Sequence, residues 1–329
     1  MEPFIPAWWC PSGHAQTVWA AAGRWRLKLP GCRRERWDTP DGDFLDVDHL
    51  PAGPGQPTLI ILHGLESSSR APQARGFLGV AQRRGWRGLA LNFRSCSGEP
   101  NRLRRSYHAG ETSDLAWVIR RLAGQHPGDP ICCVGLSLGG NVLLKYLGEQ
   151  GEAAPVLAAA AVSAPFDLAA SARAFEESAL NRVYMRRLVR SLKRKTVAKL
   201  ARHPELLDRR RLAAVRTVRD FDEAVTAPLN GFSGAEAYWT ESSGRRFLDA
   251  IRCPTLLINA LDDPLVPAEG LPHREVRQNP ALAAAFPAAG GHLGFISGGW
   301  PGQPVLWAER AVRGFFDVQL AGRDYCARV

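Results

Sequence analysis

The feature that most constrains the fold is a very tight turn between an apolar run and a helix-like segment near the middle of the chain. Residues 131–134 (ICCV) are apolar, the motif GLSLG follows at 135–139, and the next residues have the apolar spacing of a helix. Such a turn crowds the backbone on both sides of its central Ser137, and glycine tolerates this crowding. We therefore expect a strand, a sharp turn and a helix, with Ser137 at the tip of the turn. The alternative is a glycine-rich turn without a chemical role.

Strand-like and helix-like patterns alternate along most of the chain. Apolar runs predict strands at 58–62, 88–93, 130–134, 156–163, 254–259 and 285–288. Helical spacing predicts helices at 72–84, 113–124 and 304–318. This alternation favours a mostly parallel sheet with helices on both faces. The Asp41-Gly42 pair, between two short strands within 33–47, predicts a hairpin at the edge of that sheet.

One long segment interrupts the alternation. From about 165 to 247 the sequence contains helical patterns, a long basic stretch and no convincing strand. The chain has 329 residues, of which 45% are hydrophobic, and can bury a substantial core. We therefore expect a single domain over 1–329, with an N-terminal segment over 1–50 that contains the edge hairpin and a helical insertion over 165–247. Such an insertion often covers the mouth of a site as a lid.

The formal net charge is +10, and much of it lies between Arg182 and Arg211. No nucleic-acid motif or interleaved aromatic residues accompany this basic stretch, so we expect no nucleic-acid partner. The plain interpretation is a solvated helix face. The alternative is attraction to an acidic substrate, or peripheral contact of the 182–211 stretch with an anionic membrane.

The ends of the chain and its cysteines favour a reducing, cytoplasmic setting. The N-terminal residues lack a basic region and an unbroken apolar stretch, so we expect no secretory signal. No run of about 18 apolar residues predicts a membrane span. The seven cysteines include no C-x-x-C motif, and Cys132-Cys133 lies in an apolar strand. We interpret them as core residues and expect neither a metal nor another cofactor.

A serine hydroxyl becomes a nucleophile only beside a base that accepts its proton, and a carboxylate must orient that base. The expected chain order is serine, acid, histidine. The last histidine, His292, is flanked by glycines in AAGGHLGF. Asp262 and Asp263 follow a late strand, and we favour Asp263 as the acid, with Asp262 bracing the loop. The alternatives are an exposed loop histidine and turn-forming aspartates.

The negative charge that develops on an attacked carbonyl needs two backbone N–H donors. One is expected from Leu138, which follows the serine. The other is expected from Leu65, in the loop after the strand at 58–62. His63 then shapes that turn and is not a base. The carboxylate of Glu66 would repel a nearby oxyanion, so we expect its side chain to point away.

Together these residues resemble the α/β-hydrolase superfamily, and in particular its YheT-like branch, over nearly the whole length. The segments that carry the resemblance are PAWW (6–9), GHAQT (13–17), HGLESSS (63–69), NFRSCSGEPNRLRRSYHAGETSDL (92–115), GLSLGGN (135–141), VSAPFDL (162–168), LDDPLVP (261–267) and GGHLGF (290–295). The 92–115 stretch is much more specific than the serine motif. In many members of the superfamily the acid stands four residues before a proline, as Asp263 stands before Pro267.

The resemblance implies an α/β-hydrolase fold, with a mostly parallel central sheet flanked by helices and a helical lid insertion. The branch also includes eukaryotic abhydrolase-domain lipid hydrolases and yeast medium-chain ethyl-ester synthases/esterases. One departure is Ser95, where the family pattern leads us to expect glycine. The polar loop at 94–112 still needs a role: it lines the pocket, or Arg94 and Glu111 pair to hold it, and we favour the pairing.

These observations predict a serine-dependent carboxylic ester hydrolase for short- to medium-chain acyl esters. Ser137, His292 and Asp263 would carry the chemistry through an acyl-enzyme, and the N–H groups of Leu65 and Leu138 would form the oxyanion hole. One alternative is an acyltransferase that makes esters from an acyl donor and an alcohol. Another is hydrolysis of phospholipids or monoacylglycerols at the same site. A binding protein on this fold would be expected to lack part of the serine, acid and base set.

Overall fold

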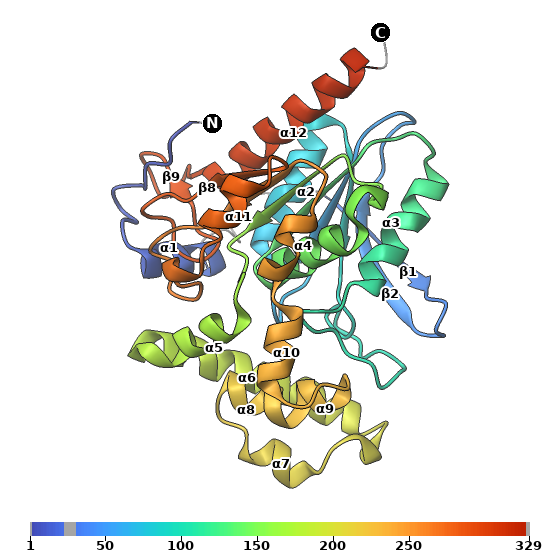
Figure 1. The fold of residues 1–329 in the computed structure, drawn as a ribbon, viewed down its shortest axis with the longest axis vertical. Coiled ribbons are helices and arrows are strands. Elements are labelled where there is room, and N and C mark those ends of the chain that lie inside the picture. The colour runs from blue at the N-terminus through green and yellow to red at the C-terminus, as the bar shows by residue number, and fades with distance from the viewer. Residues whose placement is uncertain (1, 23–30, 327–329) are drawn as a thin grey trace.

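The core of the molecule is an eight-stranded sheet in the order β1-β2-β4-β3-β5-β6-β7-β8 (Figure 1). The structure is a computed structural model that describes residues 2–22 and 31–326. The strands of this sheet are β1 (Arg33–Asp38), β2 (Phe44–Leu50), β3 (Thr58–Leu62), β4 (Arg87–Leu91), β5 (Ile131–Leu136), β6 (Ala158–Val162), β7 (Thr255–Ile258) and β8 (Leu282–Ala285), and β9 (Ile296–Ser297) pairs with β10 (Val305–Leu306) in a separate two-stranded sheet. The pairs β1–β2 and β2–β4 are antiparallel, and every other neighbouring pair is parallel. The predicted α/β class and the edge hairpin are therefore confirmed.

Helices cover both faces of the sheet. The helices beside it are α2 (Pro72–Arg84), α3 (Ser113–Gln125), α4 (Leu138–Gln150), α11 (His273–Gln278) and α12 (Trp307–Cys326), and α1 (Gly13–Ala22) packs against α2. Side chains of α3 and α4 share one apolar cluster with Ile60 and Leu62. Side chains of α2 and α12 share a second cluster with Leu59 and Ile61. Successive residues of β3 thus face opposite helical layers, which explains why residues 59–62 of this strand are all apolar.

Two predicted element positions are wrong by a few residues. The last strand of the sheet is β8 over Leu282–Ala285, three residues earlier than the predicted 285–288. The chain leaves the sheet at Pro287, which has no N–H for the ladder and whose carbonyl accepts instead from the N–H of Leu261. The closing helix α12 begins at Trp307 and continues to Cys326, beyond the predicted 304–318.

Between β6 and β7 the described chain forms helices and connecting loops but no strand. The helical segments are α5 (Leu168–Glu177), α6 (Ala179–Leu200), a 3-10 helix (Pro204–Leu206), α7 (Arg209–Ala214), α8 (Val218–Phe221), a π-helix (Asp222–Thr226), α9 (Ala227–Leu229), α10 (Ala235–Ser242) and a second 3-10 helix (Gly244–Ala250). Figure 1 shows α5 to α10 gathered at one end of the molecule. In the part of the chain that the structure describes, no helix has both the length and the apolar character needed to cross a bilayer.

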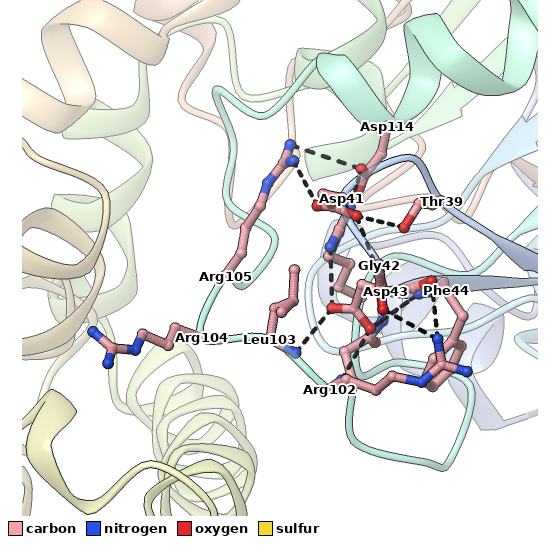
Figure 2. A network of polar contacts seen from close by, with 12 residues as sticks. Thr39, Asp41, Gly42, Asp43, Phe44, Arg102, Leu103, Arg104, Arg105 and Asp114 are labelled. Atoms are coloured by element: carbon pink, nitrogen blue, oxygen red, sulfur yellow. Dashed lines mark hydrogen bonds and ion pairs between the residues drawn. The ribbon is translucent and has the colours of Figure 1, made fainter.

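The loop after β4 is held by a buried arginine with three carboxylates. Arg94 is 2% exposed; its Nε and Nη2 donate to Asp114 at 2.8 and 2.7 Å, and Nη1 donates to Asp43 at 3.1 Å. Asp41 lies 2.9 Å from Nη2. Figure 2 shows these aspartates beside Arg105, which takes Glu111 as a partner. The predicted Arg94–Glu111 pair is therefore wrong, because the hairpin turn between β1 and β2 brings nearer carboxylates to Arg94.

Candidate active site

Ser137 lies at the tip of the turn that joins β5 to α4. Its backbone φ is +52°, in the left-handed region that non-glycine residues rarely adopt. A Cβ at Gly135 would lie 2.4 Å from the carbonyl oxygen of Gly139, and a Cβ at Gly139 would lie 2.6 Å from the carbonyl oxygen of Leu62. Both distances are far below a van der Waals contact, so only glycine fits there. The glycines let α4 start directly against the strands and place the serine side chain at the carboxyl end of β5.

Three side chains from three separate loops form one hydrogen-bonded chain. His292 Nε2 lies 2.9 Å from Ser137 Oγ, and His292 Nδ1 lies 2.9 Å from Asp263 Oδ2. The carboxylate requires that Nδ1 carry the proton, which leaves the Nε2 lone pair for the serine hydroxyl. Asp263 is buried, and its Oδ1 also accepts from the N–H groups of Leu265 and Val266. The arrangement can accept the proton of Ser137 and stabilise the resulting imidazolium.

The two neighbouring aspartates have different partners. Asp263 contacts the imidazole, whereas Asp262 Oδ1 accepts the N–H of Gly291 at 2.8 Å. Partial burial raises the pKa of Asp262 above its ordinary value. Asp262 therefore braces the loop that carries His292, in the position that the sequence interpretation gave it.

The loop after β3 passes directly over the serine. A Cβ at Gly64 would lie 3.2 Å from Ser137 Cβ, so the neighbouring Leu65 reaches the same region. Leu138 is the first residue of α4, and its N–H has no carbonyl partner within the helix. The structure thus places the two predicted donors on adjoining segments around Ser137.

His63 holds this loop through both ring nitrogens. Nδ1 donates to the carbonyl of Gly64 at 2.8 Å, and Nε2 accepts the N–H of Phe93 at 3.1 Å. Complete burial lowers the pKa of His63 to about 4. A neutral imidazole with both nitrogens engaged shapes the turn and has no free atom for catalysis.

Glu66 is tied to the helical insertion. Its carboxylate accepts from Tyr107 Oη at 2.9 Å, Ser191 Oγ at 2.6 Å and Lys195 Nζ at 3.0 Å. The last two donors lie on α6, and the backbone N–H of Glu66 donates back to Tyr107 Oη at 2.9 Å. The carboxylate is therefore neutralised by Lys195 and bonded toward α6, which connects the oxyanion loop to the insertion.

The N-terminal helix α1 supports the histidine loop, a role that the sequence interpretation missed. Thr17 Oγ1 accepts the N–H of His292 at 2.9 Å and donates to the carbonyl of Gly13 at 2.7 Å. Gln16, fully buried, accepts the N–H of Ile296 at 2.7 Å and donates to its carbonyl at 3.0 Å. The GHAQT segment was the available signal, but nothing in its composition shows that it meets a loop 275 residues later.

The described residues contain no group of three or more His, Cys, Asp and Glu side chains placed to hold a metal ion. Five cysteines are free thiols buried in the core or beside it: Cys10, Cys96, Cys132, Cys133 and Cys253.

Comparison with known proteins adds independent information. A family model described as the alpha/beta hydrolase fold matches residues 57–298. An Escherichia coli (strain K12) protein named YheT and described as a candidate esterase is 38% identical, over 98% of this chain and 95% of its own. Phospholipase ABHD3 of Mus musculus is 29% identical, over 97% of this chain and 79% of its own. The crystal structure of a Pyrococcus furiosus esterase covers 88% of this chain and 91% of its own, with a TM-score of 0.59 at 18% identity, and is similar in fold.

Proposed function

The chain belongs to the alpha/beta hydrolase family, and on that premise we propose that it is a serine-dependent hydrolase of carboxylic esters. The observation that carries the proposal is the hydrogen-bonded chain from Ser137 through His292 to Asp263. Family membership and fold do not by themselves select a reaction. The three side chains, with the backbone N–H groups of Leu65 and Leu138 that we assign as oxyanion donors, support acyl transfer through a serine nucleophile.

In the first half of the reaction, Ser137 Oγ attacks the ester carbonyl carbon while His292 Nε2 takes the hydroxyl proton. The carbonyl oxygen becomes an oxyanion that accepts from the N–H groups of Leu65 and Leu138. Asp263 stabilises the imidazolium. When the intermediate collapses, His292 gives its proton to the leaving alcohol oxygen, the ester C–O bond breaks, and the acyl group stays on Ser137.

In the second half, a water molecule replaces the alcohol. His292 Nε2 takes a proton from the water, whose oxygen attacks the acyl carbon and forms a second oxyanion at the same donors. Collapse releases the carboxylic acid and returns the proton through His292 to Ser137 Oγ. Each cycle consumes one water and restores all three side chains.

Apolar side chains of α6 and of the loop after β3 support an acyl chain as the group bound there, and we infer a short to medium length for it. Leu188 and Leu192 of α6 pack, partly buried, against the apolar cluster that contains Leu138, and Leu65 packs against the same cluster. A hydrocarbon chain bound there would be removed from water. The buried free thiols support a reducing cytoplasm as the place of work.

Two variants of this chemistry share the same residues. The similarity to a protein named phospholipase ABHD3 supports a lipid ester as the substrate. If an alcohol replaces water in the second half, the product is a new ester, and the enzyme is then an acyltransferase.

The test is hydrolysis of p-nitrophenyl esters from acetate to laurate by the wild type and by Ser137→Ala. We expect turnover that peaks at a short or medium chain and is lost in the variant. Ser171→Ala removes a buried hydroxyl on α5 and is the matched control that keeps activity. Ester formation on addition of ethanol, without hydrolysis, would select the acyltransferase. Equal turnover by Ser137→Ala would overturn the proposal.

A further inference from the structure

A hollow of about 520 Å³ lies beside the oxyanion loop, between the loop after β3, the loop after β4 and helix α6. We propose that this hollow binds a carboxylate or phosphate group of the ester substrate, so that the enzyme selects anionic esters. The inference rests on the proposed function and adds a substrate class to it.

Two of the guanidinium groups that line the hollow have no carboxylate partner in an ion pair. Five charged side chains line it: Glu66, Arg70, Glu99, Arg194 and Lys195. Lys195 neutralises Glu66, and Arg36 pairs with Glu99 at 2.7 Å. Among the residues that the structure describes, no ion pair within 4.0 Å includes Arg70 or Arg194. The nearby carboxylate of Asp48, whose pKa Arg70 helps to lower, is paired with Arg34 instead. An oxyanion in the hollow would supply the missing partner, and guanidinium groups bind carboxylate and phosphate through paired N–H donors.

Serine hydroxyls add neutral donors to the same hollow. Ser68 Oγ accepts the N–H of Arg70 at 3.2 Å, and Ser95 Oγ accepts the N–H of Asn101 at 3.1 Å. Because both oxygens accept in these contacts, their own protons remain available for a ligand oxygen. Ser95 has a φ of +62°, a backbone conformation unfavourable for a residue with a side chain. This strained serine is one of the residues that line the hollow.

The hollow is lined by the loop that passes beside Ser137, although Ser137 itself is not part of its lining. A Cβ at Gly64 would lie 3.2 Å from Ser137 Cβ, and Glu66, which lines the hollow, follows Gly64 by two residues. Two Cα–Cα steps cover at most about 7.6 Å. An ester attacked at Ser137 can thus place a charged group a few bonds from its carbonyl into the hollow.

The experiment compares matched esters that differ in one charge. One pair is p-nitrophenyl pentanoate and mono-p-nitrophenyl glutarate, which carries the anion in the acyl part. The other pair is 1-butyrylglycerol and 1-butyrylglycerol 3-phosphate, which carries it in the alcohol part. The variants are Arg194→Gln and Arg70→Gln. The control is Arg190→Gln, which removes an exposed arginine of the same helix that does not line the hollow.

We expect the wild type to have the higher kcat/KM for the anionic member of at least one pair. Each of Arg194→Gln and Arg70→Gln should lower that value about tenfold, as expected for a lost charge-assisted hydrogen bond, and leave the neutral ester unchanged. The control should change neither. If neither pair shows a charge preference, or if the preference survives both substitutions, the inference is wrong.

A binding measurement separates this inference from the proposed function. Calorimetric titration of Ser137→Ala with 1-butyrylglycerol 3-phosphate measures the affinity of the hollow for this ligand without turnover. If Arg194→Gln, added to Ser137→Ala, weakens this binding but the wild type hydrolyses none of the esters, the result would support the anion site and contradict the esterase proposal. Hydrolysis of neutral esters by the wild type, with no binding that depends on Arg194, would support the esterase proposal and overturn the proposed anion site.

Discussion

Asp262 and Asp263 are adjacent in the chain, but only Asp263 contacts the imidazole of His292. Asp263→Asn replaces the acceptor with an amide that cannot stabilise an imidazolium and favours the wrong tautomer, so we expect kcat to fall about 10³- to 10⁴-fold. Asp262→Asn keeps an oxygen that can accept from Gly291, and we expect a loss of less than about tenfold. Steady-state kinetics on one p-nitrophenyl ester measures both. A larger loss of kcat in Asp262→Asn than in Asp263→Asn would show that Asp262 is the acid.

His63 makes stability depend on pH. Its pKa is about 4 in the folded protein and about 6.5 when unfolded. Below pH 6.5 His63 becomes protonated in the unfolded chain but stays neutral in the folded protein. Protonation therefore stabilises the unfolded state, and the free energy of unfolding decreases as the pH falls toward 4. Between pH 7 and pH 4.5 this lowers the free energy of unfolding by about 2–3 kcal/mol.

Urea unfolding at pH 7 and pH 4.5 measures the total loss, to which His108 also contributes because burial lowers its pKa to about 4. His63→Gln should reduce the difference between the two pH values, whatever its stability at pH 7. His273→Gln, at an exposed position, should keep the wild-type difference. An unchanged difference in His63→Gln would contradict the contribution of His63.

At the residue scale, the sequence was most informative where chemistry restricts the choice. Ser137 stands between glycines and His292 beside them, and the structure brings both together with Asp263. The partner of Arg94 was not predictable, because its carboxylates come mainly from a hairpin turn some 50 residues away. Nothing local in the sequence shows how that turn folds over the loop.

At the scale of elements, helix α1 sets the position of the histidine loop through Thr17. Thr17→Val removes the acceptor for the N–H of His292 and keeps the side-chain volume. We expect kcat to fall about tenfold at unchanged KM, because a buried donor loses its partner and the imidazole shifts.

Thr17→Ser restores the hydroxyl and should recover most of the activity, which a purely structural loss would not predict. The readout is kcat and KM for all three proteins at one pH. If Thr17→Val keeps wild-type kcat, α1 does not position His292.

The boundaries of an element were predictable where residues at its ends mark them, and not where pairing with a distant strand decides them. Helix α2 has the predicted bounds, Pro72–Arg84, because proline occupies its first turn and Gly85 ends it in a left-handed conformation. Strand β8 was misplaced because alanines stand at 283–285 and again at 288–289, which leaves the register open. The hydrogen bonds of β7 decide it by pairing Thr255 with Leu282 and Ile258 with Ala285.

At the scale of the whole molecule, the net charge of +10 is concentrated on α6. Arg182, Arg186, Arg187 and Arg190 are exposed there, and Leu180 and Val183 are exposed at the start of the same helix. Contact with an anionic membrane stays a prediction. We expect co-sedimentation with phosphatidylglycerol vesicles but not with phosphatidylcholine vesicles, and release as salt is raised from 50 to 500 mM.

Replacing these four arginines with glutamine should abolish vesicle binding, whereas hydrolysis of a dissolved neutral ester should not change. Equal sedimentation with both lipids, or binding that survives the substitutions, would support the plain interpretation of a solvated helix face.

The parallel sheet and its helical layers followed from periodicity, and the position of the serine turn followed from its glycines, because each depends on patterns within a few residues. The connections between distant segments did not, among them α1 with the histidine loop and α6 with Glu66. Such contacts depend on how the whole chain packs, which no local pattern records.

The central claim is that Ser137 is the nucleophile, activated by His292 and Asp263. The most direct measurement is mass spectrometry after incubation with diethyl p-nitrophenyl phosphate, which phosphorylates activated serines. We predict one diethylphosphoryl adduct on the peptide that contains Ser137, no adduct in Ser137→Ala, and much slower labelling in Asp263→Asn. An adduct on another residue, or equal labelling of Ser137→Ala, would contradict the account.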